Sequence, residues 1–121
     1  MKALVVDDSL TIRRIIVKTL TTIGCAAADE AADGKQAVDA VRKGGYDLIL
    51  MDWNMPNMTG IEALRAIREA GNKTPVVMVT TEAEKARVIE AIKAGANDYL
   101  IKPFTPDQLA AKARNVLGAK A

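Results

Sequence analysis

The chain has 121 residues, of which 50% are hydrophobic and 26% charged, and it carries a formal net charge of +2 with a pI near 8.8. This size and composition fit one globular domain. Lysine and arginine form no long run and only 3% of residues are aromatic, which argues against binding to nucleic acid or to a membrane. Asp7 interrupts the first apolar segment too early for a signal peptide, and the single Cys25 has no disulfide partner within the chain. We therefore expect a cytoplasmic protein, with Cys25 a small buried residue.

Strand-length apolar segments occur along the chain at 3–6, 48–51, 76–79 and 99–101. Each is continuous rather than alternating, which is typical of strands that are covered on both faces. A further strand is expected over 25–30, although its run of alanines is a weak strand former.

Helical patterns lie between these strands. In one segment, apolar side chains recur every three or four residues at Ile12, Ile16, Leu20 and Ile23. In a second segment they recur every three residues at Ile61, Leu64 and Ile67. The pairs Thr59 with Glu62 and Thr105 with Gln108 fit capping boxes, and Pro106 fits the first position of a helix. The alternation predicts five βα units: a single doubly wound α/β domain over 1–121, with a parallel five-stranded sheet and helices on both faces.

Polar residues follow the ends of several predicted strands, at Asp7, Asp8, Asp52, Thr80 and Lys102. Parallel sheets bind ligands at the carboxyl ends of their strands, so the fold would gather these side chains at one edge. Carboxylates that lie close together repel unless a cation neutralises them. An oxygen-rich cluster of this kind suits Mg²⁺ and phosphoryl chemistry.

Each of these residues also has a simpler explanation when taken alone. Asp8 or Ser9 could cap the first helix, and Thr80 or Thr81 could cap the fourth. Lys102 could be a solvated surface charge. It is the five residues together that indicate a site.

The chain contains no histidine, so the chemistry of this edge must use carboxylates. A carboxylate can accept a phosphoryl group to form an aspartyl-phosphate. Asp52 is the candidate nucleophile, because Asp7 and Asp8 have the doubled charge of metal ligands. Lys102 would supply a cation for the phosphoryl oxygens, and the Thr80 hydroxyl could follow the new group and move the next loop.

Four separated motifs resemble the receiver domain of bacterial response regulators, and in particular its chemotaxis members. These motifs are Asp7-Asp8, 51–60, 78–83 and 99–104, and the resemblance extends from about residue 2 to residue 117. It implies a five-stranded sheet in the order 2-1-3-4-5. It also implies that a partner histidine kinase supplies the phosphoryl group to Asp52, and that Asp7, Asp8, Asp52 and the backbone carbonyl of Asn54 hold Mg²⁺, with Asp8 the more direct ligand.

The same resemblance assigns roles to the residues around Asp52. Thr80 and Tyr99 would form a switch pair, in which the hydroxyl moves to the phosphate and the ring turns inward. Asn54 and Glu82 would tune self-dephosphorylation and give a short-lived active state. Lys102 would contact the phosphate, with a cis bond to the proline that follows it. Thr81 departs from the alanine usual at its position, with an effect of unknown sign on access to the site.

The resemblance also implies that output occurs at the face built by the fourth helix, fifth strand and fifth helix. Its residues would be Ala83, Lys85, Val88, Ile92, Tyr99, Ile101, Phe104 and Lys112. For the apolar members, ordinary core packing is the alternative. The basic residues Arg13, Arg14 and Lys18 of the first helix read as a solvated face, with kinase docking as the alternative.

We expect no attached output domain and no turnover enzyme, only self-phosphorylation and self-dephosphorylation. The protein would be a monomer that docks to a target such as a flagellar motor switch protein, with a phosphatase as a further partner. Alternatives are a stand-alone phosphorelay or another two-component receiver. A Mg²⁺-dependent phosphohydrolase is less favoured because no Asp-x-Asp motif follows the first strand, and a nucleotide or flavin binder because no glycine-rich phosphate loop does.

Overall fold

A computed structural model describes residues 1–25 and 27–118. In chain order its elements are β1 (Lys2–Val6), α1 (Leu10–Thr22), β2 (Ala27–Ala31), α2 (Gly34–Lys43), β3 (Leu48–Met51), α3 (Gly60–Glu69), β4 (Val76–Thr80), α4 (Lys85–Ala94), β5 (Asp98–Ile101) and α5 (Pro106–Gly118). All strand pairs are parallel and the sheet order is β2-β1-β3-β4-β5. The predicted (βα)5 fold class and strand order are therefore confirmed.

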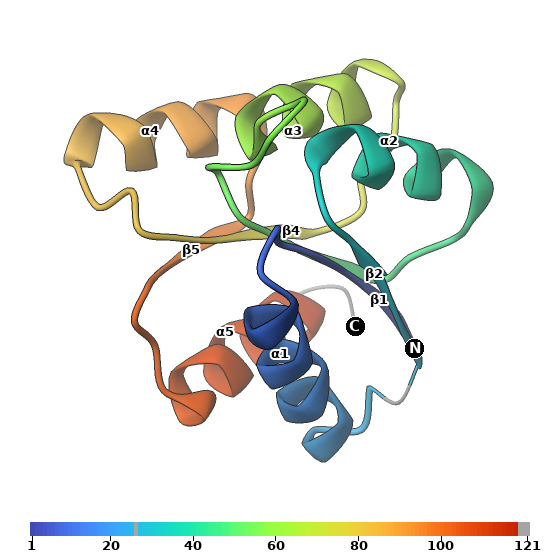
Figure 1. Cartoon of the computed structure of the whole chain (residues 1–121), viewed down its shortest axis with the longest axis vertical. Coiled ribbons are helices and arrows are strands. Elements are labelled where there is room, and N and C mark those ends of the chain that lie inside the picture. The colour runs from blue at the N-terminus through green and yellow to red at the C-terminus, as the bar shows by residue number, and fades with distance from the viewer. Residues whose placement is uncertain (26, 119–121) are drawn as a thin grey trace.

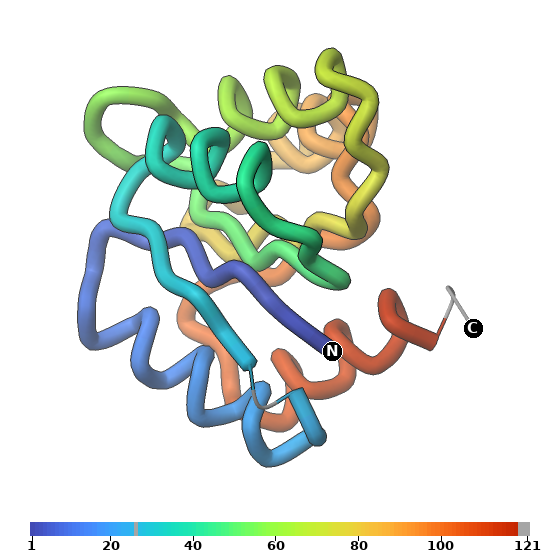
Figure 2. Tube along the Cα trace, turned by 90° about the vertical axis from the view of Figure 1, so that its right-hand side faces the viewer, coloured from blue at the N-terminus to red at the C-terminus, as the bar shows by residue number. Residues whose placement is uncertain are grey.

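The sheet lies between two layers of helices. Helices α2, α3 and α4 cover one face, and α1 and α5 cover the other (Figures 1 and 2). Alternate residues of a strand point to opposite layers, so Leu4 and Val6 pack under α2 and α3 while Ala3 and Val5 pack against α1 and α5. This two-sided burial is the reason that β1, β3 and β4 are continuous apolar segments.

The second strand differs from its predicted bounds. It begins at Ala27 rather than at Cys25, and Ala26 lies outside the described residues. The Cys25 amide donates to the carbonyl of Leu20 at 2.9 Å, so Cys25 still belongs to the turn that ends α1. Its side chain is buried, as predicted. The strand lies at the edge of the sheet and most of its residues are exposed. It therefore does not need large apolar side chains, and alanines are tolerated there.

Helix starts follow the capping chemistry of the sequence at most positions. Both predicted capping boxes are formed, and Pro106 is the first residue of α5. Ser9, rather than Asp8, caps α1. Neither Thr80 nor Thr81 caps α4: Glu84 occupies that position, and its side chain makes no capping bond. Among the described residues, no helix combines the length and the apolar character needed to cross a membrane.

Candidate functional site

Three carboxylates meet at the carboxyl ends of two neighbouring strands, β1 and β3. Val6 of β1 pairs with Met51 of β3, so the residues that follow them, Asp7 and Asp52, emerge side by side. One carboxylate oxygen from each of Asp7, Asp8 and Asp52 lies within 4.8 Å of the other two. Asp7 and Asp52 are buried, at 1% and 7% exposure, whereas Asp8 faces solvent. The tertiary structure therefore brings together the three acids that the sequence predicted as one cluster.

Lys102 provides the positive charge of this cluster. Its Nζ lies 2.6 Å from Oδ2 of Asp7 and 3.1 Å from Oδ2 of Asp52. Burial by itself lowers the pKa of Lys102, but the hydrogen bond to Asp7 and the charges of both acids raise the pKa by a larger amount. The net pKa is therefore above its ordinary value, and the ammonium stays charged. The bond from Lys102 to Pro103 is cis, as predicted.

The charges of the cluster do not balance. One ammonium faces three carboxyl groups, which leaves excess negative charge in a partly buried site. The available donor atoms are carboxylate oxygens, the ligands that hard divalent cations prefer. The cluster could therefore hold a metal ion.

Arg13 is a site residue that sequence reasoning missed. Its Nη1 donates to the backbone carbonyl of Asp7 at 2.6 Å, and its Nε donates to Glu30 at 3.0 Å. The expectation of a solvated basic face is wrong for Arg13, whose side chain is 15% exposed, although Arg14 and Lys18 are exposed. Nothing in the sequence distinguishes Arg13 from Arg14, because only the packing of α1 beside β2 decides which one faces the site.

The segment after Asp52 turns back sharply toward the sheet. The Trp53 amide donates to Oδ1 of Asp52 at 2.7 Å, and the Gly60 amide donates to the Trp53 carbonyl at 2.8 Å. A Cβ at Gly60 would lie 1.8 Å from the Asp52 carbonyl oxygen, so this close approach requires glycine. The loop therefore presses the start of α3 against the end of β3.

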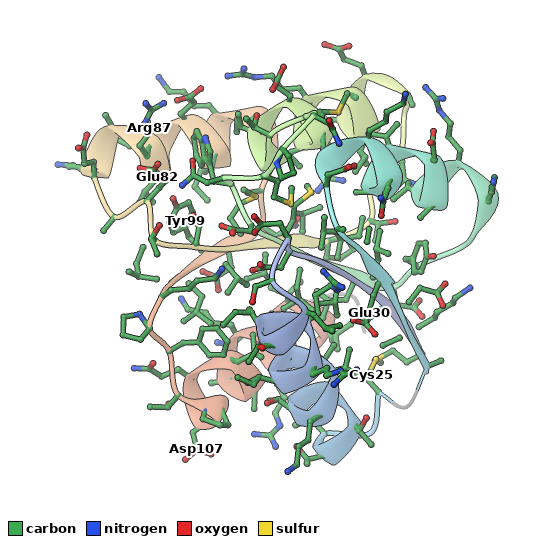
Figure 3. The ribbon with its side chains drawn as sticks, viewed as in Figure 1. Cys25, Glu30, Glu82, Arg87, Tyr99 and Asp107 are labelled. Carbon is green, nitrogen blue, oxygen red and sulfur yellow. The ribbon has the colours of Figure 1, made fainter. Side chains whose placement is uncertain are left out.

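The predicted switch and tuning residues meet at Glu82. Asn54 Nδ2 donates to the Glu82 carboxylate at 3.0 Å, and the Glu82 amide donates to the Thr80 hydroxyl at 3.3 Å. The hydroxyl of Tyr99 donates to the Glu82 backbone carbonyl. Tyr99 is buried, and this burial, followed by the charge of Glu82, raises its pKa to about 12. Figure 3 shows Tyr99 and Glu82 on the same side of the molecule, below α4.

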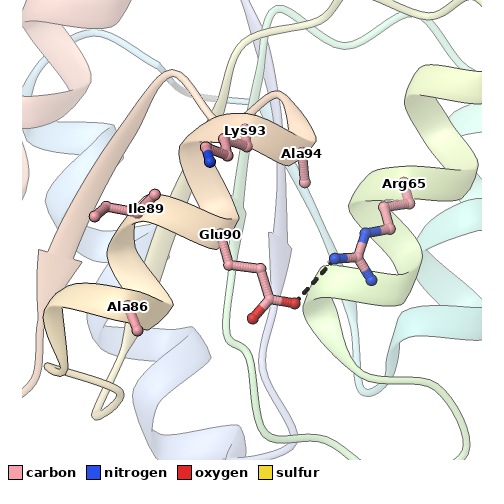
Figure 4. A pocket seen from close by; sticks show the side chains of 6 residues that line it. All are labelled: Arg65, Ala86, Ile89, Glu90, Lys93 and Ala94. Atoms are coloured by element: carbon pink, nitrogen blue, oxygen red, sulfur yellow. Dashed lines mark hydrogen bonds and ion pairs between the residues drawn. The ribbon is translucent and has the colours of Figure 1, made fainter.

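Arg87 of α4 is a second residue that the sequence did not single out. Its guanidinium lies 5.4 Å from the centre of the Trp53 ring, a cation–π contact beside the acidic cluster. Arg87 also pairs with Glu90 at 3.3 Å, and Glu90 pairs with Arg65 of α3 at 2.9 Å. Figure 4 shows this second ion pair across the hollow between α3 and α4, which none of the predicted site residues lines.

The predicted output face carries exposed apolar side chains. Ile92 and Ile101 are 47% and 37% exposed, so core packing does not explain them, and Ile89 beside them is 42% exposed. Val88 is half-buried against the core. Lys112 pairs with Asp98 at 2.9 Å, so it is not a free charge on this face.

Comparison with known proteins identifies the family. The response regulator receiver domain family matches residues 3–114. The chain belongs to this family. A receiver domain acts as a phosphoacceptor switch rather than as a conventional enzyme.

Individual relatives of this receiver domain include chemotaxis proteins. It is 48% identical over 121 residues to a CheY homolog of Campylobacter jejuni, covering 98% of this chain and 93% of that protein. It is 46% identical over 118 residues to CheY of Pseudomonas aeruginosa, covering 96% and 95%. Among solved structures, CheY4 of Vibrio cholerae superposes with a TM-score of 0.89 at 39% identity, covering 96% and 98%. The receiver domain of Francisella response regulator 1452 superposes with a TM-score of 0.92 at 32% identity, covering 99% and 98%.

Proposed function

We propose that this receiver domain is a phosphorylation switch of bacterial chemotaxis, with Asp52 as the phosphoacceptor. The convergence of Asp7, Asp8 and Asp52 around the ammonium of Lys102 is the observation that carries the proposal. Chemotaxis is favoured over another two-component pathway because the relatives at 46% and 48% identity are named CheY.

The phosphoryl transfer uses a carboxylate oxygen of Asp52 as the nucleophile. It attacks the phosphorus of a phosphohistidine on the partner kinase, the P–N bond breaks, and the electron pair returns to the imidazole. Asp52 is then a mixed anhydride with phosphate, which water hydrolyses to regenerate the carboxylate. Lys102 holds its charge next to the transferred oxygens, because it is 3.1 Å from Asp52 before transfer.

The metal that suits this site is Mg²⁺, which Asp7, Asp8, Asp52 and the backbone carbonyl of Asn54 would hold. The all-oxygen donor set and the uncompensated negative charge support this choice. When bound, Mg²⁺ supplies positive charge that offsets the phosphoryl oxygens during transfer. The solvent-facing Asp8 is free to act as the more direct ligand, whereas Asp7 is already engaged by Lys102 and by the Ser9 amide at 2.9 Å.

The phosphodonor approaches across the end of α1. A groove beside α1 includes Lys102 in its lining, together with Ile12, Ile15, Thr81, Pro103 and Phe104. Because Lys102 belongs to both the groove and the acidic cluster, a protein that fills the groove brings its phosphohistidine close to Asp52. This supports kinase docking on the face of α1 that borders the groove.

Phosphorylation is read out through Thr80, Glu82 and Tyr99. A phosphoryl group on Asp52 draws the Thr80 hydroxyl toward it, which competes with the bond from the Glu82 amide. Because the Tyr99 hydroxyl binds the Glu82 carbonyl, the change reaches the exposed Ile92 and Ile101 face, where the target docks. A flagellar motor switch protein is the proposed target. A coupling free energy of about 1–3 kcal/mol between Asp52 and the target-binding face is sufficient to make target affinity depend on phosphorylation.

The test is a phosphorylation assay with a small phosphodonor such as acetyl phosphate and Mg²⁺. Intact mass and Trp53 fluorescence are recorded for the native protein and for Asp52→Asn. We expect the native protein to gain one phosphoryl group and the variant to gain none, because an amide is no nucleophile here. Equal phosphorylation of Asp52→Asn would overturn the assignment, and sustained turnover of unrelated phosphoesters would indicate a phosphohydrolase instead.

A further inference from the structure

The loop that follows the phosphoacceptor is held on two sides by different contacts. On one side, Asn54 binds Glu82, which belongs to the segment that the proposed switch moves. On the other side, Asn57 Nδ2 donates to Oδ2 of Asp33 at 2.7 Å. Asp33 belongs to neither the acidic cluster nor the proposed switch. This second contact therefore holds the loop to a part of the molecule that the proposed switch does not move.

Asp33 is well suited to this anchoring role. It is 6% exposed, and both of its carboxylate oxygens are used: Oδ1 accepts the Gln36 amide at 2.8 Å as the cap of α2, and Oδ2 accepts Asn57. The bond from the Gln36 amide, followed by the bond from Asn57, holds the pKa of Asp33 below its ordinary value. The anchor therefore stays ionised at neutral pH, and its bond to the Gln36 amide ties it to the start of α2.

The backbone of the loop is shaped to meet this anchor. Asn57 is the one residue other than glycine with positive φ, at 66°, in the part of the chain that the structure describes. The Gly34 amide donates to the Met58 carbonyl at 3.1 Å, and a Cβ at Gly34 would lie 2.5 Å from that oxygen. Two neighbouring residues of the loop thus contact two neighbouring residues at the start of α2.

We propose that Asp33 and Asn57 are positioning residues for the Mg²⁺ site: their hydrogen bond holds in place the loop that carries the backbone carbonyl of Asn54. This inference rests on the function proposed above. The Asn54 carbonyl lies three residues from Asn57, inside a loop closed by the bond between Gly60 and Trp53. Outer contacts that orient metal ligands affect affinity strongly even though they do not touch the metal.

Two variants remove the contact from opposite ends. Asn57→Gly deletes the donor and still accepts positive φ. Asp33→Ser deletes Oδ2 and still caps α2, because serine is a favourable N-cap residue. For each variant we expect Mg²⁺ affinity, followed by Trp53 fluorescence, to fall about tenfold. The Mg²⁺ affinity of the double variant should fall by the same factor as that of either single variant, because both substitutions remove the same hydrogen bond.

Asn72→Gly is the matched control. Asn72 also holds a loop, through a 2.8 Å bond from the Thr74 amide, but that loop precedes β4 at the opposite edge of the sheet. We expect this variant to be less stable with unchanged Mg²⁺ affinity. In metal-free protein, the amides of Gly34 and Gly60 should exchange faster in Asn57→Gly than in Asn72→Gly, since only the former frees the phosphoacceptor loop.

Asp8→Asn separates the inference from the proposed function. If Asp8→Asn loses the Mg²⁺ response while Asn57→Gly and Asp33→Ser bind as the native protein does, only the positioning role is overturned. If Asp8→Asn itself binds Mg²⁺ with native affinity, the metal site proposed above is overturned. Should Asn57→Gly fail to fold, as judged by circular dichroism, Asp33→Ser decides the result alone.

Discussion

At the scale of single residues, Tyr99 shows how burial and hydrogen bonding define the environment of a proposed switch residue. In the sequence, Tyr99 is part of an apolar strand segment, and only the family resemblance pairs it with Thr80, whereas the structure buries its ring and directs its hydroxyl to the Glu82 carbonyl. A phenol buried beside carboxylates resists ionisation, because both the lost hydration and the neighbouring negative charge disfavour the phenolate.

The two tyrosines of the chain provide a pH test of this environment. Burial is the main cause that raises the pKa of both Tyr46 and Tyr99 to about 12. Since the folded state favours the neutral phenol, the resulting stabilisation is complete below about pH 10 and is lost as the pH rises toward 12. We expect the phenolate absorbance to rise together with alkaline unfolding measured by circular dichroism.

Tyr99→Phe serves as the control for this titration, because it leaves Tyr46 as the only tyrosine. In that variant the total rise in phenolate absorbance should be half that of the native protein, and none of the rise should occur near pH 10 while the protein is folded. A tyrosine that titrates near its ordinary pKa of 10.0 in folded protein would contradict the buried position of the ring.

At the scale of the elements, the join between β3 and α3 is the most tightly constrained part of the site. The capping box of Thr59 and Glu62 determines where α3 begins, and this was readable from the sequence. The sequence did not indicate that Gly60 would touch the carbonyl of Asp52, because that contact depends on how closely the helix approaches the strand. The position of α3 and the position of Asp52 are therefore coupled through one glycine.

Substitution Gly60→Ala tests this coupling. The added methyl group would overlap the Asp52 carbonyl, and overpacking of this kind costs about 1–3 kcal/mol of unfolding free energy. Gly45→Ala is the control, because a Cβ there meets nothing within 4 Å. Urea denaturation should show a lower midpoint for Gly60→Ala and little change for Gly45→Ala. Equal midpoints for the two variants would show that α3 can shift without cost.

At the scale of the whole molecule, the sheet joins two hydrophobic cores into one folding unit. One core contains Leu64 and Met78, and the other contains Leu109 and Val77. Val77 and Met78 are adjacent in β4, so loss of packing on one face disturbs the strand that supports the other face. Small domains of this kind usually unfold in one cooperative transition.

Leu109→Ala tests whether the two cores unfold together. Leu109 is fully buried in the core beneath α5, and its truncation should cost roughly 2–5 kcal/mol. Trp53 belongs to the opposite core, yet its fluorescence midpoint in urea should shift as far as the midpoint from circular dichroism. A shift confined to circular dichroism would indicate that the two layers unfold independently.

The sequence by itself determined most of the strands and which polar residues gather at one edge of the sheet. Continuous apolar segments predicted β3 at its observed bounds, and they predicted β1, β4 and β5 to within one residue at each end. These predictions succeed because strands covered on both faces tolerate few polar residues. The residues Asp7, Asp8, Asp52, Thr80 and Lys102 could be grouped because all of them follow, or end, parallel strands. The start of β2 was the exception, since an exposed edge strand has no need for an apolar pattern.

Only the tertiary structure decided which polar side chains contact the acidic cluster and the loop that follows it. Arg13, Asp33, Asn57 and Arg87 act through distances between elements that are remote in sequence, and each belongs to a residue type that is common on surfaces. Burial likewise separated the exposed Ile92 and Ile101 from the buried Tyr99. The physical reason is that local patterns determine secondary structure, whereas contacts between side chains depend on how the helices pack on the sheet.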